Sequence, residues 1–109
     1  MTHILIYKSK AGEYKGFNCI GHAEYAASGE DIICAGISVL VINTINSIEI
    51  LAGDKFDLVA NDEEGLIHCS FPEPINEKSI LLMDSLVLGL EGIKKQYGKK
   101  YLDLTFEEV

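Results

Sequence analysis

The chain has 109 residues, of which 48% are hydrophobic, and its formal net charge is −8. This length predicts a single domain over residues 1–109 with one modest core. The acidic balance argues against direct binding to nucleic acid, because phosphate contacts need a basic face, and it suits a basic partner or a basic peptide substrate.

The cysteine content and the apolar runs predict a cytoplasmic protein without a membrane segment. The three cysteines, Cys19, Cys34 and Cys69, contain no Cys-x-x-Cys pair, which argues against a disulfide framework and favours a reducing compartment. The apolar run over residues 4–7 is too short for a signal peptide, and the run over residues 32–42 is too short to span a membrane.

Five segments are predicted to be strands, because apolar or β-branched residues alternate within them and turn residues separate them. These segments are residues 2–8, 14–22, 55–60, 66–71 and 100–107. The first two are expected to form a hairpin, and the next two a second hairpin around residues 61–65.

A long apolar run between the hairpins predicts a helix that ends near Ala52, with Gly53 as its stop signal. Either Ser28 or Asp31 can cap its start, after a small and polar loop over residues 23–30. One face of this helix carries Ile33, Ile37, Leu40, Val41, Thr44, Ile48 and Leu51 at helical spacing. Further apolar residues lie elsewhere around it, namely Ile32, Val39, Ile42 and Ile50. A helix that is apolar on most sides is predicted to be central and buried.

A second helix is predicted from a cap at Asn76 to Tyr97, with Gly98 after it. Its apolar stripe can pack on the sheet or pair with another subunit. The predicted order is β-β-α-β-β-α-β, which indicates a two-layer α+β domain: a largely antiparallel sheet with two helices on one face.

The segment that carries chemistry places His22 twelve residues before Cys34. The histidine closes a predicted strand, and the cysteine falls in the first turn predicted for the first helix. Unpaired N–H groups and the helix dipole stabilise a thiolate there, and an imidazole can take the thiol proton and later protonate a leaving amine. A buried cysteine beside a histidine at a strand edge is the alternative, and placement alone leaves both open.

The run Gly21-His22-Ala23 … Gly29-x-Asp31-Ile32-x-Cys34-Ala35-x-x-Ser38 resembles the Prp family, the ribosomal-processing cysteine proteases of bacteria. The resemblance implies that His22 and Cys34 are the catalytic pair and that no cofactor is needed. It also implies removal of an N-terminal extension from the twenty-seventh protein of the large ribosomal subunit, by a homodimer.

Several neighbours have a possible supporting role. Asp31 can cap the helix through the N–H of Cys34, or orient His22 as the third member of a triad. Ser38, four residues after Cys34, can hydrogen-bond near the thiol or back to a helix carbonyl. The flexible substrate loop and its borders include Gly21, Ala23 and Gly29. Of these, Gly21 and Gly29 are hinge candidates or ordinary turn glycines.

A zinc site can be drawn from Cys19, His22, Cys34 and His68, but it lacks the paired short spacings of structural zinc sites, so no metal is expected.

The expected reaction begins when the 23–30 loop closes over an extended substrate and the Cys34 thiolate attacks the scissile carbonyl. N–H groups at the helix start hold the oxyanion, and His22 protonates the leaving amine before water releases the acyl-enzyme. One alternative is a non-enzymatic, acidic, dimeric module that binds a ribosomal protein or assembly factor, in which Cys34 is inert. Another is a thiol redox or metal-sensing domain, which predicts either a resolving partner for Cys34 or metal bound in stoichiometric amount. No neighbouring cysteine in the sequence supplies such a partner.

Overall fold

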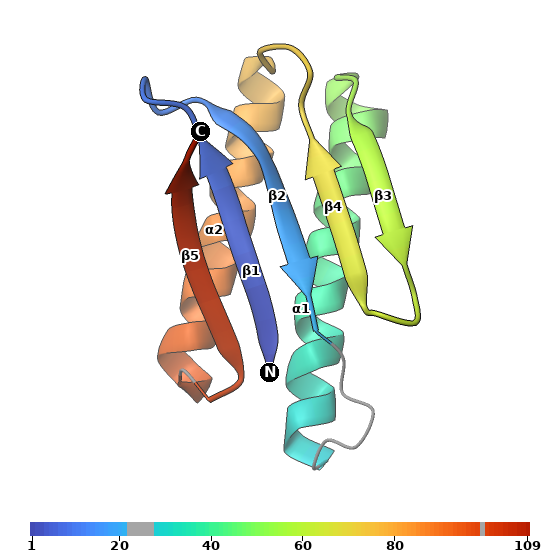
Figure 1. Ribbon diagram of the computed structural model, residues 1–109, viewed down its shortest axis with the longest axis vertical. Coiled ribbons are helices and arrows are strands. Elements are labelled where there is room, and N and C mark those ends of the chain that lie inside the picture. The colour runs from blue at the N-terminus through green and yellow to red at the C-terminus, as the bar shows by residue number, and fades with distance from the viewer. Residues whose placement is uncertain (22–27, 99) are drawn as a thin grey trace.

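The computed structural model describes residues 1–21, 28–98 and 100–109, with the backbone alone for residues 28–31. Its elements follow the predicted order (Figure 1): β1 (Thr2–Lys8), β2 (Tyr14–Ile20), α1 (Ser28–Ser47) continued by a π-helical turn η1 (Ile48–Ala52), β3 (Asp57–Asn61), β4 (Leu66–Ser70), α2 (Glu77–Tyr97) and β5 (Leu102–Glu108).

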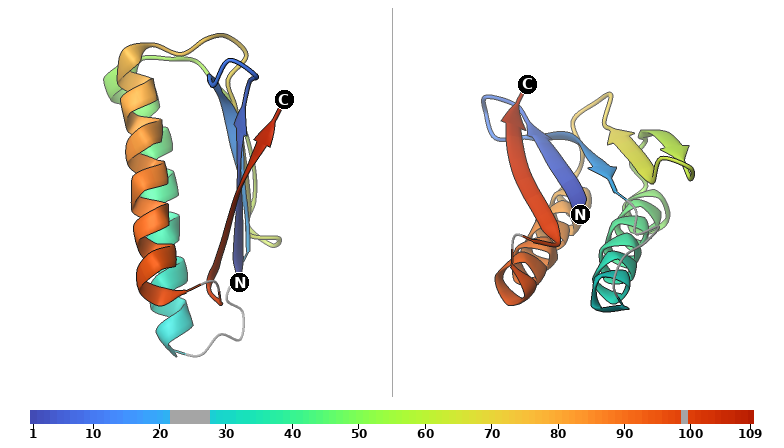
Figure 2. Two further views of the ribbon diagram at one scale, coloured as in Figure 1. Left: turned by 90° about the vertical axis from the view of Figure 1, so that its left-hand side faces the viewer. Right: turned by 60° about the horizontal axis from the view of Figure 1, so that its bottom comes forward.

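The five strands form one sheet in the order β3-β4-β2-β1-β5. The neighbours β3–β4, β4–β2 and β2–β1 are antiparallel, whereas β1 and β5 are parallel. Both helices cover the same face of the sheet, and the other face is open (Figure 2). The prediction of a largely antiparallel sheet with two helices on one face is therefore confirmed.

The core lies between the sheet and the two helices. β1 turns Ile4 and Ile6 inward, and α2 contributes a fully buried row that contains Met83, Leu86 and Leu90. The apolar stripe of α2 therefore packs on the sheet. Asn76 caps α2 as predicted, because its side chain accepts hydrogen bonds from the N–H groups of Lys78 and Ser79.

The prediction that the first helix is buried on most sides is wrong. One face of α1 packs inward, but Ile32 and Val39 are 72% and 67% exposed on the opposite face. A helix in a two-layer fold has only one neighbouring layer, so the far side of its apolar surface stays open. Leu51, predicted on the buried face, is 66% exposed, because the wider π-helical turn changes the angle between successive residues.

The C-terminal end of this helix agrees with the sequence. Gly53 adopts a left-handed conformation with φ 73°, and its N–H donates to the carbonyl of Ile48. By length and composition, the helix over Ile32–Ala52 would suffice to cross a membrane, although the unbroken apolar run within it is shorter. Core helices meet the same criterion, and we assign this helix to the core because Ile37 and Val41 are buried against the sheet and α2.

Candidate active site

An open pocket of about 300 Å³ lies where β1, β2, α1 and the β3–β4 hairpin meet. Three of the predicted site residues line it: Gly21, Cys34 and Ser38. The rest of the wall comes from segments far apart in the sequence, namely Thr2, Cys19, Ala35, Ile42, Asn61, Asp62, Gly65, Leu66 and Ile67.

Cys34 is the cysteine most open to a reagent. Its side chain is partly exposed, and its Sγ lies 3.6 Å from the Oγ1 of Thr2. Cys19 is 7% exposed, and burial, followed by the influence of Cys34, raises the pKa of the Cys19 thiol to about 11. Cys69 is fully buried, and burial, followed by the charge of Asp57, raises the pKa of the Cys69 thiol to about 12. Cys19 and Cys69 are therefore held as neutral thiols near pH 7.

The fold places Cys19 in the wall of the same pocket as Cys34, although the two residues are 15 positions apart in the sequence. Spacing in the sequence did not reveal this neighbour. All three cysteines are free thiols in this structure.

The start of α1 corrects several predictions. The helix begins at Ser28, so residues 28–30 are helical and not loop, and Gly29 lies inside the first turn. Asp31 is the fourth helical residue, which excludes it as the cap, and Cys34 is the seventh, in the second turn. The unpaired N–H groups of a helix belong to its first four residues. Cys34, in the second turn, therefore lies beyond the residues that carry them.

Gly21 has a more definite role than a hinge or turn. Its N–H donates to the carbonyl of Gly65 at 3.3 Å, which ties the end of β2 to the β3–β4 hairpin. A Cβ at Gly21 would lie 2.7 Å from both the Cα of Thr2 and the carbonyl oxygen of Met1, and its φ of +152° is one that L residues rarely adopt. The next residue in the chain is His22, which lies outside the described residues together with Ala23.

The β3–β4 hairpin forms a wall that the sequence did not connect with the thiol. Its turn is organised by Asn61, whose Oδ1 accepts hydrogen bonds from the N–H groups of Glu63 and Glu64 at 3.0 and 3.3 Å. Asp62 of this turn lines the pocket. The acidic composition of this turn can be read from the sequence, but the distance between the turn and Cys34 depends on how β4 pairs with β2.

The described residues of the candidate zinc site, Cys19, Cys34 and His68, do not come together as metal ligands. Among the residues that the structure describes, no group of three His, Cys, Asp or Glu side chains is placed to hold a metal ion. His68 has another environment: its Nδ1 lies 3.1 Å from the Oδ1 of Asn18, and its ring meets that of Tyr7 edge to face at 6.0 Å. Strand residues alternate between faces, so His68 points away from the helices while its neighbour Cys69 is buried under them.

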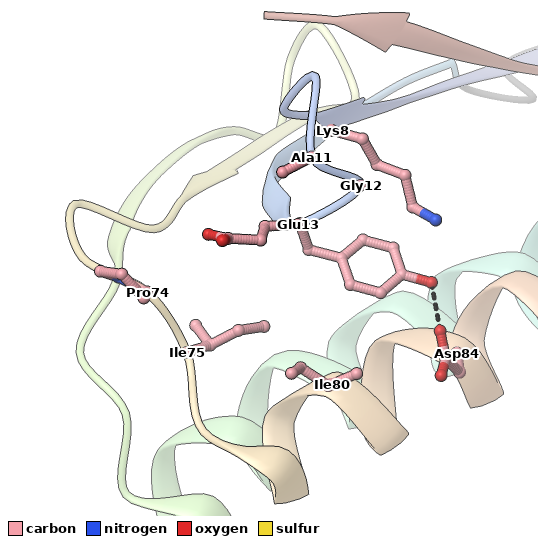
Figure 3. Close-up of a pocket in the computed structure, with 9 residues that line it drawn as sticks. Lys8, Ala11, Gly12, Glu13, Pro74, Ile75, Ile80 and Asp84 are labelled. Carbon is pink, nitrogen blue, oxygen red and sulfur yellow. Dashed lines mark hydrogen bonds between the residues drawn. The ribbon is translucent and has the colours of Figure 1, made fainter.

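A second cavity, of about 470 Å³, opens near the other end of β1 (Figure 3). There the hydroxyl of Tyr14 donates to the Oδ1 of Asp84 at 2.5 Å, and the Nζ of Lys8 lies 4.5 Å from the Tyr14 ring centroid. Burial, followed by Asp84, raises the pKa of Tyr14. Since no cysteine lines this cavity, thiol chemistry points to the pocket at Cys34.

A two-layer α+β domain with one partly exposed thiol in an open pocket has the features of a small cysteine protease, and the comparisons with known proteins agree. The profile of the family described as cysteine protease Prp matches residues 1–102. The ribosomal processing cysteine protease Prp of Bacillus subtilis is 32% identical over 101 residues, which are 89% of this chain and 90% of that protein. The chain belongs to the Prp family of cysteine proteases.

Solved structures of the family share the fold. The essential ribosomal processing protease Prp of S. aureus in complex with a substrate peptide matches with a TM-score of 0.90 and 23% identity, over 98% of this chain and 100% of that chain. The same protease with a covalently linked product peptide matches with a TM-score of 0.87 and 24% identity, over the same shares.

Proposed function

We propose that this cysteine protease removes the N-terminal extension of the twenty-seventh protein of the large ribosomal subunit, with Cys34 as nucleophile and His22 as general base and acid. The observation that carries the proposal is the position of Cys34: it is partly exposed in an open pocket, while Cys19 and Cys69 are buried. Gly21, which precedes His22, lines the same pocket.

The reaction follows from a thiolate at this position. The Cys34 Sγ attacks the scissile carbonyl carbon, and the tetrahedral oxyanion collapses to a thioester as the amine leaves with a proton from His22. Water, which His22 deprotonates, then attacks the thioester, and the carboxylic acid leaves as the Cys34 thiol is regenerated. The covalently linked product peptide in the S. aureus relative supports a covalent step.

A basic protein substrate is supported by charge. The formal net charge is −8, and Asp62 of the acidic turn Asp62-Glu63-Glu64 lines the pocket. Ribosomal proteins are basic, so long-range attraction would speed their encounter with this surface. The same charge disfavours direct contact with RNA, and we propose that the enzyme acts in the cytoplasm on the free protein.

A homodimer is supported by the outer side of the helical layer. Ile32 and Val39 of α1 are seven residues apart, as are Leu81 and Leu88 of α2, and all four are at least 67% exposed. Both helices cover the same sheet face (Figure 2), and these four side chains are exposed instead of packed between the helices and the sheet. We propose that a second copy covers this apolar surface, because such surfaces favour association.

The test is cleavage of the extended ribosomal protein, followed by mass spectrometry, with the wild type beside Cys34→Ala and His22→Ala. We expect one defined cut in the N-terminal extension by the wild type and none by either variant. The matched control is Cys69→Ala, which removes a buried thiol and should retain the cut as long as the variant folds. A cut that survives in Cys34→Ala would refute the assigned nucleophile. A folded wild type that makes no cut would refute the substrate.

Sedimentation at several protein concentrations tests the dimer, with Leu88→Glu as the variant. We expect twice the monomer mass for the wild type and a monomer for the variant, since a charge would be buried in the interface. A wild type that stays monomeric at tens of micromolar would contradict this part of the proposal.

A further inference from the structure

Thr2 lies beside the Cys34 thiol, although the two residues are far apart in the sequence. It is the first residue of β1, 32 positions before Cys34, and its Oγ1 lies 3.6 Å from the Cys34 Sγ. The residue is 4% exposed and lines the pocket that holds the thiol. A polar side chain buried at this point has the sulfur as its hydrogen-bonding neighbour.

The position of Thr2 is fixed by the sheet. Its N–H donates to the carbonyl of Tyr101 at 3.1 Å, and its Cα is paired with that of Leu102 in β5. Gly21 at the end of β2 approaches so closely that a Cβ there would lie 3.2 Å from the Thr2 Oγ1. Since a β-branched side chain is also stiff at χ1, the hydroxyl is held in place before any substrate arrives.

The direction of the hydrogen bond depends on the protonation state of sulfur. A neutral thiol can donate to the hydroxyl or accept from it, whereas a thiolate has no proton and can only accept. A hydrogen bond to a charged acceptor is stronger than one to a neutral acceptor. The Thr2 hydroxyl therefore favours the ionised form of Cys34 and keeps its sulfur turned toward the pocket.

We propose that Thr2 is a positioning residue of this protease, whose hydroxyl donates to the Cys34 thiolate and increases its proportion near neutral pH. The inference rests on the proposed role of Cys34 as the nucleophile. Once sulfur is acylated it no longer carries a negative charge, so the hydroxyl acts on the free enzyme and not on the thioester.

The expected effect has a signature that a merely structural role lacks. If the hydroxyl increases the thiolate proportion about tenfold, its removal shifts the pH profile of Cys34 alkylation upward by about one pH unit. A less stabilised thiolate is also more nucleophilic, by about threefold for a Brønsted coefficient near 0.5. The rate at pH 7 should then fall about threefold, while the plateau at high pH should rise about threefold.

The experiment measures the rate of Cys34 carboxamidomethylation by iodoacetamide between pH 5.5 and 9.5, by peptide mapping, in the wild type, Thr2→Val and Thr2→Ser. Valine keeps the shape and removes the hydroxyl, and serine keeps the hydroxyl. For Thr2→Val we expect a rate profile that lies below that of the wild type near pH 7 and above it at high pH. For Thr2→Ser we expect the profile of the wild type. Circular dichroism checks that each variant is folded, and Thr2→Ala replaces Thr2→Val if valine prevents folding.

A folded hydroxyl-free variant with an unshifted profile would overturn the proposal, and so would an equal loss of rate at every pH. The profile is read at Cys34 without any protein substrate, so it is separate from the cleavage assay. Cleavage that persists in Cys34→Ala would refute the proposed nucleophile, and the Thr2 inference with it. A shifted profile in an enzyme that leaves the ribosomal protein intact would support Thr2 and refute only the substrate.

Discussion

The burial of Cys19 and Cys69 makes a quantitative prediction about a variant that lacks Cys34. In Cys34→Ser, the two remaining thiols should react slowly with a neutral disulfide such as 4,4′-dithiodipyridine at pH 8. The pKa of the Cys19 thiol is raised from 9.0 to about 11, first by burial and then by Cys34, and that of the Cys69 thiol from 9.0 to about 12. Burial remains in the variant but the influence of Cys34 is lost, so the figures for Cys19 that follow are upper limits. The thiolate fractions at pH 8 are then about 100-fold and 1,000-fold lower than those of ordinary cysteines.

Part of this loss is offset because a thiolate of higher pKa is a better nucleophile. With a Brønsted coefficient of about 0.5, the net rates should fall about tenfold for Cys19 and about thirtyfold for Cys69, relative to a free thiol. Exposures of 7% and 0% restrict access to the sulfur atoms and slow both reactions further.

The assay follows release of 4-thiopyridone by absorbance, with glutathione as the free-thiol reference and mass spectrometry to locate the modified cysteine. Unfolding Cys34→Ser in urea should release both thiols at the rate of an ordinary cysteine. The wild type should show one additional fast equivalent, at Cys34. A fast equivalent from native Cys34→Ser would refute the assignment of Cys34 as the accessible thiol.

Three further predictions concern stability and the pocket. Native Cys19 and Cys69 ionise at higher pH than in the unfolded chain. Their contribution to the free energy of unfolding should therefore be fully present below the unfolded-state pKa of about 9 and fall above it, by up to roughly 1.4 kcal/mol per pH unit for each thiol, in urea titrations. Gly21 has φ +152° and closely approaches Thr2. The substitution Gly21→Ala should therefore lower the free energy of unfolding, measured in urea, by about 2 kcal/mol or more and lower the cleavage rate at least tenfold. Tyr14→Phe removes the hydrogen bond to Asp84, so it should lower the free energy of unfolding by about 1–2 kcal/mol and leave cleavage unchanged.

Each of these predictions has a control and a contrary result. A free energy of unfolding that stays flat from pH 9 to 10.5 would contradict the alkaline prediction, and Cys69→Ala should reduce the slope by one thiol. Gly53→Ala is the matched control for Gly21→Ala, since φ is +73° there with nothing within 4 Å of an added Cβ; it should cost about 1 kcal/mol and preserve cleavage. Loss of cleavage in a folded Tyr14→Phe would show that the cavity in Figure 3 matters to the reaction.

Local patterns in the sequence predicted the element order and several boundaries. The strand Thr2–Lys8, the cap at Asn76, the helix end at Tyr97 and the stop at Gly53 agree with the structure. Each depends on neighbours within a few residues: alternation along a strand, a side chain that accepts from nearby N–H groups, or a glycine that adopts a left-handed conformation. The candidate pair His22 and Cys34 was also found locally, from its spacing and motif.

Local patterns failed where the answer depended on another layer of the fold. The apolar face of α1 with Ile32 and Val39 is open because the second layer lies on only one side. The helix starts at Ser28, three residues before the cap candidate Asp31, which moves Cys34 into the second turn.

The wall around the thiol was decided only by long-range strand pairing. Thr2 reaches Cys34 because β1 is held between β2 and β5, and the hairpin with Asp62 reaches it because β4 pairs with β2. Periodicity reports which face of its own element a residue occupies, but it carries no information about which distant element lies opposite. The candidate nucleophile was therefore visible in the chain, whereas the groups that surround it became visible only once the strands had been placed side by side.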